Sequence, residues 1–403
     1  MAEVDFSNKK ALLIEDMAEA RILQKKMLGD FGFKQIEVAM KAESAIELLR
    51  HNTYDLVLSD YNLGNGKDGQ QLLEEVRHSS LIPNTSTYIM VTAETSIEMV
   101  MGAIEYQPDG YITKPFSQAL LQRRLRKLLD SKEKLQAINL ALDHKDFQSA
   151  ITEAEKLTTA TPYLAGKCQR IIGECLIELK KYDEAKKIYS DSLKNRKMPW
   201  ALFGLAKVLF FQQRYSEAEN KFKQLTLDNR FFVNAYDWLA KCLVAQGKDS
   251  DAQEVLIQAI SKSPKNILRQ LELGRLSQVL GKYSIAEMSY RRAVFLAKHS
   301  CYNLPEIYLG HLESLVHLAT HEPLDSRQKD GFQTTLKRLE ANFSENPEVQ
   351  FKKYELIIQF YVESKQTSQA ILTLETWDQA AEQGQTAPPP EELRVTLLSL
   401  QGK

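Results

Sequence analysis

The sequence predicts an α/β domain built on a doubly wound, five-stranded parallel sheet, followed by an all-α helical array. Three observations support this fold class. Up to about residue 130, five short apolar runs alternate with amphipathic segments. Beyond that point the strand signal disappears, and helical periodicity continues almost to the end of the chain. In this second part a short pattern recurs every 33 or 34 residues, which is typical of stacked helical hairpins.

The first part alternates strictly between strand and helix signals. Apolar runs rich in β-branched residues predict strands at 11–14, 36–39, 56–59, 88–91 and 110–113. Amphipathic segments predict helices at 18–31, 42–50, 69–77, 96–104 and 117–129. Such alternation favours a parallel sheet with helices on both faces. In sheets of this kind, the functional chemistry gathers beyond the carboxyl ends of the strands.

Polar and charged residues stand where four of these strands end. Glu15 and Asp16 follow the first strand, Asp60 ends the third, Thr92 ends the fourth and Lys114 ends the fifth. Because the carboxyl ends of parallel strands share one edge of a sheet, we expect these side chains to converge. Each alone could be an ordinary strand-end cap, but the five together point to a site. Three neighbouring carboxylates repel one another unless a divalent cation lies among them, and Mg²⁺ prefers oxygen ligands.

This constellation, over residues 9–130, resembles the CheY-like receiver domain of two-component response regulators. The resemblance implies the flavodoxin-like strand order 2-1-3-4-5. It implies that Asp60 attacks the phosphoryl group of a phosphohistidine on a partner kinase and becomes an aspartyl phosphate. It further implies that Lys114 and Thr92 contact phosphoryl oxygens, and that Lys114-Pro115 is a cis peptide. The implied Mg²⁺ ligands are Glu15, Asp16, Asp60 and the backbone carbonyl of Asn62.

The same resemblance implies a switch and a pair of tuning positions. Thr92 and Tyr111 stand where the family's threonine and aromatic residue move upon phosphorylation, although an aromatic residue that merely covers the sheet edge is the alternative for Tyr111. Asn62 and Glu94 stand where the family tunes spontaneous dephosphorylation, and this pair predicts a phosphate lifetime of seconds to minutes. The loop at 63–69 departs from the family because it carries an extra residue and lacks the usual Met-Pro pair, so we expect a mobile loop.

The second part repeats a motif that begins as Tyr182-Asp183-Glu184-Ala185, with equivalent alanines at positions 218, 252 and 286. A small residue lies twelve positions before each alanine, and a large apolar residue lies four positions after it. Small residues let two helices approach closely, and large ones fill the space between neighbouring hairpins. A single hairpin cannot bury its apolar face, so several must stack. The pattern resembles the tetratricopeptide repeat, most clearly over residues 163–298.

These patterns divide the chain into a receiver domain at 1–130 and a TPR-like helical repeat domain at 131–403. Residues 299–346 break the period, so we expect irregular or longer helices there. A further helical hairpin is predicted at 347–380.

Tetratricopeptide solenoids usually bind a protein or peptide along a concave groove, which the residue after each small position faces. Here those positions include Lys207, Lys241, Arg275 and, with a shifted period, His311. The three consecutive cations would form a column that could hold an acidic segment. The alternative is a solvated face whose spacing is a coincidence.

Composition and motifs argue against several other classes of protein. The net charge of -1 over 403 residues gives no electrostatic case for binding nucleic acid or an acidic membrane. No stretch approaches the ~20 apolar residues of a membrane span, and the polar N-terminus does not resemble a signal peptide, so we expect a cytoplasmic protein. Beyond residue 130 we find no catalytic motif and no DNA-reading motif. We therefore expect no enzyme activity other than phosphoryl transfer and autodephosphorylation at the receiver.

The leading interpretation is a response regulator that receives its phosphoryl group from a histidine kinase or phosphotransfer protein. It would signal by protein contacts through the repeats, and phosphorylation could also alter a homodimer formed through the receiver. The alternative is a phosphate sink or inhibitor, which docks on a shared kinase and drains or blocks the phosphorelay. A sink should bind its kinase through the repeats, and its partners should not change upon phosphorylation.

Overall fold

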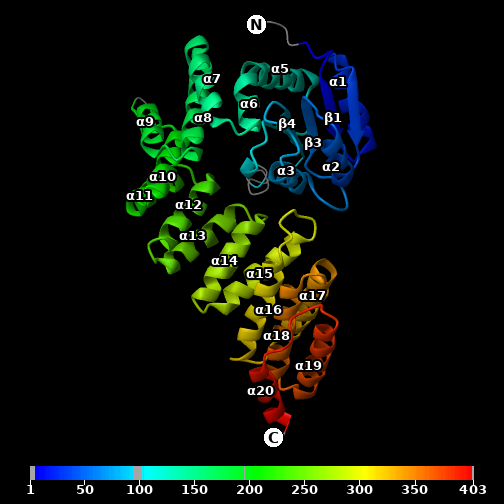
Figure 1. The fold of residues 1–403 in the computed structure, drawn as a ribbon. Coiled ribbons are helices and arrows are strands. Elements are labelled where there is room, and N and C mark those ends of the chain that lie inside the picture. Colours follow the sequence, from blue (N-terminus) through cyan, green and yellow to red (C-terminus); the bar gives the residue numbers. More distant parts are fainter. Residues whose placement is uncertain (1–4, 94–101, 103, 195, 402–403) are drawn as a thin grey trace. The chain divides into compact units, whose positions relative to one another are not determined.

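The computed structural model describes residues 5–93, 102, 104–194 and 196–401 (Figure 1). The chain forms two compact units, each described here by itself. The first runs to Lys265 and includes His299–Cys301, and the second comprises Asn266–Lys298 and the residues from Tyr302 onward. Among the described residues, no helix is both long enough and apolar enough to cross a lipid bilayer.

A five-stranded parallel sheet forms the N-terminal part of the first unit (blue to cyan in Figure 1). Its strands run in the order β2-β1-β3-β4-β5, and every neighbouring pair is parallel. The predicted fold class and strand order are therefore confirmed. The strands are β1 (Lys10–Ile14), β2 (Gln35–Ala39), β3 (Leu56–Asp60), β4 (Thr87–Thr92) and β5 (Gly110–Thr113).

Helices cover both faces of this sheet. Alternate residues of each central strand point to opposite sides, so Leu12 and Ile14 pack with α2 and α3, while Ala11 and Leu13 pack with α1 and α5. The predicted helix at 96–104 falls mostly outside the described residues. The helices are α1 (Ala18–Asp30), α2 (Ala42–His51), α3 (Gly69–His78) and α5 (Gln118–Lys134).

The rest of the first unit is a series of helices that pack as consecutive antiparallel neighbours. The repeat alanines predicted to lie between helices, among them Ala185, Ala218 and Ala252, are completely buried. The helices are α6 (Gln136–Asp143), α7 (Phe147–Ala160), α8 (Ala165–Glu178), α9 (Tyr182–Leu193), α10 (Pro199–Phe211), α11 (Tyr215–Asp228), α12 (Val233–Val244) and α13 (Asp249–Lys262), with a 3₁₀ turn at Pro162–Leu164.

The close packing of these hairpins depends on glycines that face one aromatic ring. A Cβ atom on Gly173 would lie 2.4 Å from Tyr189 Cζ, and a Cβ atom on Gly204 would lie 2.2 Å from Tyr189 Cε1. The Tyr189 ring therefore lies between its own hairpin and the next one, where only glycine leaves room for it. The periodicity of the sequence predicts the first of these contacts but not the second.

The second unit repeats this arrangement. Tyr290 lies against Gly274 of its own hairpin and against Gly310 of the next helix. Residues 299–346 hold two regular helices, α16 (Pro305–Ala319) and α17 (Ser326–Phe343), so of the two expected possibilities, irregular or longer helices, the longer helix is found. The period breaks because α17 extends over 18 residues and a longer linker precedes α16. The helices are α14 (Ile267–Val279), α15 (Tyr283–Ala297), α16 (Pro305–Ala319), α17 (Ser326–Phe343), α18 (Pro347–Glu363), α19 (Thr367–Glu382) and α20 (Glu391–Gln401).

Candidate functional site

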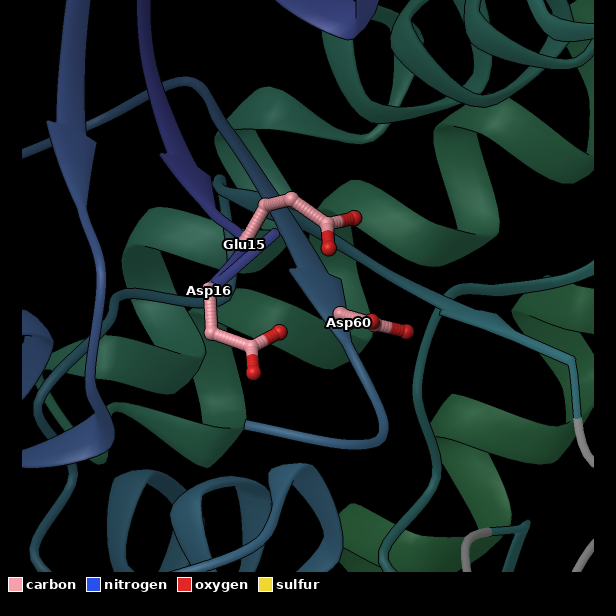
Figure 2. A group of neighbouring side chains, drawn as sticks. All are labelled: Glu15, Asp16 and Asp60. Atoms are coloured by element: carbon pink, nitrogen blue, oxygen red, sulfur yellow. The ribbon is translucent and has the colours of Figure 1, made fainter. Parts of the chain in front are cut away.

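Three carboxyl groups converge at the carboxyl edge of the sheet (Figure 2). Glu15 and Asp16 directly follow β1, and Asp60 is the last residue of the neighbouring strand β3. Ligand oxygens of the three residues all lie within 4.8 Å of one another. Glu15 is completely buried and Asp60 is only 6% exposed, whereas Asp16 is partly exposed. The sheet thus brings together the acidic residues that the strand ends predicted.

A single lysine connects two of these carboxylates. Lys114 follows β5, and its ammonium donates hydrogen bonds to Glu15 Oε2 at 2.8 Å and to Asp60 Oδ2 at 2.9 Å. The lysine side chain is 22% exposed, so these ion pairs are largely shielded from water. The Lys114-Pro115 peptide bond is cis, as the resemblance implied.

The electrostatics of the cluster show an excess of negative charge. Burial, with a further contribution from the charge on Glu15, raises the pKa of Asp60 to about 6, although Lys114 and the Tyr61 backbone N–H act in the opposite direction. Burial alone would lower the pKa of Lys114, but its hydrogen bonds to Glu15 and Asp60 outweigh burial and raise it. One ammonium therefore does not balance three carboxylates, and a bound cation would offset the remaining negative charge.

The donor set fits a hard divalent cation. All three groups that converge here are carboxylates, and the cluster contains no thiolate or imidazole. Asn62 is exposed and lies two residues beyond Asp60, between the buried residues Tyr61 and Leu63, and its carbonyl is the further oxygen that the resemblance implies. Glu15, Asp16 and Asp60 are thus the residues of this chain that could hold Mg²⁺.

Two residues of α1 position the acidic pair, and sequence reasoning missed both of them. Gln24 is buried, and its amide donates to Glu15 Oε2 at 2.7 Å. The Arg21 guanidinium donates to the backbone carbonyls of Glu15 and Asp16 at 3.0 and 2.9 Å. Both lie on the helix that follows the acidic pair, but no sequence pattern distinguishes them from other polar residues of that helix.

The expected switch residues occupy the same region. Thr92 ends β4 and is completely buried. Tyr111, on β5, is partly buried and packs against the apolar core between the sheet and the helices α2 and α3. Glu94, the second tuning position, lies outside the described residues.

In the repeats, two of the three predicted groove cations meet one aromatic ring. The Lys207 ammonium lies 5.4 Å from the Trp238 ring centroid, and the Lys241 ammonium lies 4.7 Å from it. The pKa of Lys207 is lowered because the side chain is buried, although the charges of Glu174 and Glu178 act in the opposite direction. Arg275 is exposed on α14, in the other compact unit.

His311 does not occupy a groove position, and that expectation is wrong. Its side chain is 1% exposed, and its Nδ1 atom lies 2.8 Å from Thr335 Oγ1 on α17. The ring is buried because α17 packs over α16, which a spacing rule for regular hairpins does not anticipate.

Two family models match separate parts of the chain. The family model described as response regulator receiver domain matches residues 11–126, and the one described as tetratricopeptide repeat matches residues 203–267. Chemotaxis protein CheY-3 of Vibrio cholerae serotype O1 is 31% identical over 123 residues, which are 30% of this chain and 93% of that protein. Chemotaxis protein CheY of Pseudomonas aeruginosa is 28% identical over 121 residues, which are 30% of this chain and 96% of that protein.

Two solved structures are similar to separate parts of the chain. A CheY-like response regulator receiver domain protein from Methanospirillum hungatei JF-1 is 26% identical, with a TM-score of 0.29, and the match covers 31% of this chain and 97% of that one. The C-terminal part of a TPR repeat-containing protein from Cytophaga hutchinsonii is 16% identical, with a TM-score of 0.47, and the match covers 60% of this chain and 93% of that one. The family model at residues 11–126 and the 31% identity to a CheY protein that is covered to 93% of its length show that the chain belongs to the response regulator receiver family, and it carries tetratricopeptide repeats after the receiver domain.

Proposed function

We propose that this chain accepts a phosphoryl group on Asp60 from a histidine kinase or phosphotransfer protein, and signals through protein contacts made by its repeats. The observation that carries the proposal is the position of Asp60. Its Oδ2 atom lies 2.9 Å from the Lys114 ammonium, and its carboxylate lies among those of Glu15 and Asp16. The receiver is proposed to end near residue 130, within α5, and the repeats to follow from residue 131.

Phosphoryl transfer requires mainly that the protein position the reacting groups and neutralise their negative charge. A carboxylate oxygen of Asp60 forms the new bond to phosphorus as the bond between phosphorus and the donor's histidine nitrogen breaks. Lys114 offsets negative charge on a phosphoryl oxygen, and the Thr92 hydroxyl donates a hydrogen bond to another. Glu15, Asp16, Asp60 and the Asn62 carbonyl would hold Mg²⁺, which when bound supplies further charge neutralisation.

Thr92 and Tyr111 are proposed to convert phosphorylation into a change of surface. Thr92 ends β4 opposite Thr113, and Tyr111 lies on β5 opposite Met90, three residues before Lys114. Movement of the threonine toward a phosphoryl oxygen would free space for the aromatic ring. Asn62 and Glu94 are proposed to set how quickly water removes the phosphoryl group.

The proposed output surface is the cationic and aromatic cluster around Trp238. Two lysines flank one indole ring, and the rings of Phe203, Phe210 and Phe211 lie 6.5, 5.3 and 5.7 Å from it. Such a cluster favours a protein segment that combines acidic and apolar side chains. Arg275 is proposed to extend this preference for acidic partners.

Phosphoryl labelling of the full-length chain tests the first half of the proposal. With acetyl phosphate and Mg²⁺, we expect one hydroxylamine-sensitive phosphoryl group per chain, which is lost in Asp60→Asn and on chelation of the metal. The matched control is Asp55→Asn, because Asp55 lies before β3 at the opposite edge of the sheet. Labelling that persists in Asp60→Asn would show that another residue accepts the group.

Partner capture tests the second half. The full-length chain should bind its partner differently with and without beryllofluoride, a mimic of the phosphoryl group, and Lys241→Glu should weaken that binding. An unchanged partner list that consists of the kinase alone would favour the phosphate sink or inhibitor instead. The mass of the chain in solution under both conditions reports any homodimer formed through the receiver.

A further inference from the structure

One lysine of the repeats contacts the loop that follows the phosphoacceptor. Lys265 lies between α13 and α14, in the same compact unit as the sheet. Its ammonium donates to Asp68 Oδ2 at 2.9 Å and to the Tyr61 hydroxyl at 3.2 Å, and it lies 5.3 Å from the Tyr61 ring centroid. The Tyr61 hydroxyl donates its proton to Gln70 Oε1 at 3.1 Å, and its oxygen accepts from the lysine.

This loop is the segment that links Asp60 to α3. Tyr61 directly follows Asp60, and its backbone N–H donates to Asp60 Oδ1 at 2.8 Å. Asp68 caps α3 by accepting from the Gln71 backbone N–H at 2.9 Å. One ammonium therefore binds both ends of the loop that carries Asn62, and the middle of the loop passes beside the acidic cluster, where a Cβ atom on Gly64 would lie 3.1 Å from Asp16 Oδ2.

A second segment of the repeats contacts α3 itself. The Ser300 hydroxyl donates to Glu74 Oε2 at 2.8 Å, and the other carboxylate oxygen of Glu74 accepts from the Tyr106 hydroxyl. Glu74 is 4% exposed and Ser300 is 8% exposed. A hydrogen bond to a buried carboxylate is costly to lose, because the carboxylate is then left without a full set of donors. This contact is therefore more than a surface ion pair.

We propose that Lys265 and Ser300 form a regulatory contact on the receiver, called here the repeat–receiver contact, which holds the loop at 61–68 and α3 in place and which phosphorylation of Asp60 weakens. The inference rests on the proposed function. With a phosphoryl group on Asp60 and Mg²⁺ beside it, the Asn62 carbonyl would have to approach the cation, and one ammonium that holds both ends of the loop opposes that movement. Because coupling between two equilibria is reciprocal, loss of the repeat–receiver contact must favour the phosphorylated form by the same factor.

The test measures binding of beryllofluoride, in the presence of Mg²⁺, to the full-length chain. Lys265→Met removes the ammonium and should tighten binding about 5-fold, a value at the lower end of measured couplings between sites. Asp68→Asn keeps the helix cap, because asparagine also caps, and it should act in the same direction. Combining the two changes should add little to either one, since both remove the same ion pair. The matched control is Lys262→Met, because the Lys262 ammonium lies over Tyr236 within the repeats.

Amide hydrogen exchange gives a second measurement, which beryllofluoride would not change if the repeat–receiver contact were only structural. Beryllofluoride should speed exchange at residues 263–266 and 299–302 of the unmodified sequence, and Ser300→Ala should speed exchange in α3 without the ligand. Equal affinities of Lys265→Met and Lys262→Met for beryllofluoride would contradict the regulatory role of the repeat–receiver contact. So would unchanged amide exchange at 263–266 and 299–302 while exchange in the receiver changes. Neither result would contradict the proposed function. Failure of beryllofluoride to bind any of the chains would instead contradict the proposed function.

Discussion

The ammonium of Lys114 lies 2.9 Å from Asp60 Oδ2 and 2.8 Å from Glu15 Oε2, so one cation holds together two carboxylates that are almost completely buried. Lys114 comes from the end of β5, whereas Asp60 comes from the end of β3, two places away in the sheet. The lysine therefore stabilises the site, and under the proposed function the same ammonium would contact the phosphoryl group.

Replacing Lys114 with methionine should destabilise the protein. The change leaves Asp60 and Glu15 facing each other without a cation, and breaking a buried ion pair from one side costs about 3 to 5 kcal/mol. Urea unfolding at pH 7 in a metal-free buffer measures this loss. Lys127→Met on the exposed face of α5 is the control and should change stability little. Equal stability of the two variants would mean that the ion pairs contribute nothing.

Stability without metal should depend on the charge of Asp60. Its pKa is raised from 3.8 to about 6, mainly by burial, so the folded chain holds this proton more tightly than the unfolded chain. The contribution of Asp60 to the free energy of unfolding is therefore fully present below its pKa in the unfolded chain, 3.8. It is lost as the pH rises through the folded pKa of about 6.

Asp60→Asn removes that charge and should raise the free energy of unfolding at pH 7 by about 1 to 3 kcal/mol in a chelating buffer. Denaturant titration at several pH values measures the difference. Addition of Mg²⁺ should reduce the difference in the free energy of unfolding between the variant and the wild type, because a cation that binds only the folded wild-type chain stabilises that chain. A variant less stable than the wild type at pH 7 without metal would contradict this account.

Gly204→Ala should disrupt the packing of neighbouring repeats. The new methyl group would lie 2.2 Å from the buried ring of Tyr189, and this overlap should cost about 1 to 3 kcal/mol. Thermal unfolding of the variant measures the cost, and adding Tyr189→Leu should recover part of it. Gly166→Ala, where the structure shows nothing within 4 Å, is the matched control and should be neutral or slightly stabilising. Equal losses at both glycines would argue against the steric explanation.

Glu219 should stabilise the repeats at neutral pH and lose this role in acid. Burial raises its pKa, but hydrogen bonds from Lys223, Lys248 and Gln246 outweigh burial and lower it to about 2. A carboxyl group whose pKa is lowered on folding stabilises the folded state when the pH is above its pKa in the unfolded chain. This contribution is lost as the pH falls toward its pKa in the folded chain.

Glu219→Gln should therefore lower the free energy of unfolding by about 1 to 2 kcal/mol at pH 7 and by much less near pH 3. Chemical denaturation at the two pH values tests this. Glu217→Gln is the control, because Glu217 makes an exposed pair with Arg214, and such pairs contribute little. A loss that is the same at both pH values would show that packing, not charge, is responsible.

Much of the site follows from sequence because strand ends are local signals. Asp60, Lys114 and the acidic pair Glu15 and Asp16 each stand beside an apolar run, and parallel strands bring such residues to one edge. The predicted helices also correspond to those found wherever the residues are described. By contrast, Gln24 and Arg21 show no distinguishing pattern, because an amphipathic helix carries polar residues at many positions.

The sequence by itself determined the receiver sheet, the edge at which the chemistry gathers and the small-to-large periodicity of the repeats, since these depend on spacings within a few residues or one repeat. Only the tertiary structure decided that Lys265 meets Asp68, that Ser300 meets Glu74 and that His311 is buried. The first two contacts join residues 197 and 226 positions apart. Their formation depends on how whole elements pack, because a hydrogen bond requires a separation of about 3 Å that no local sequence pattern encodes.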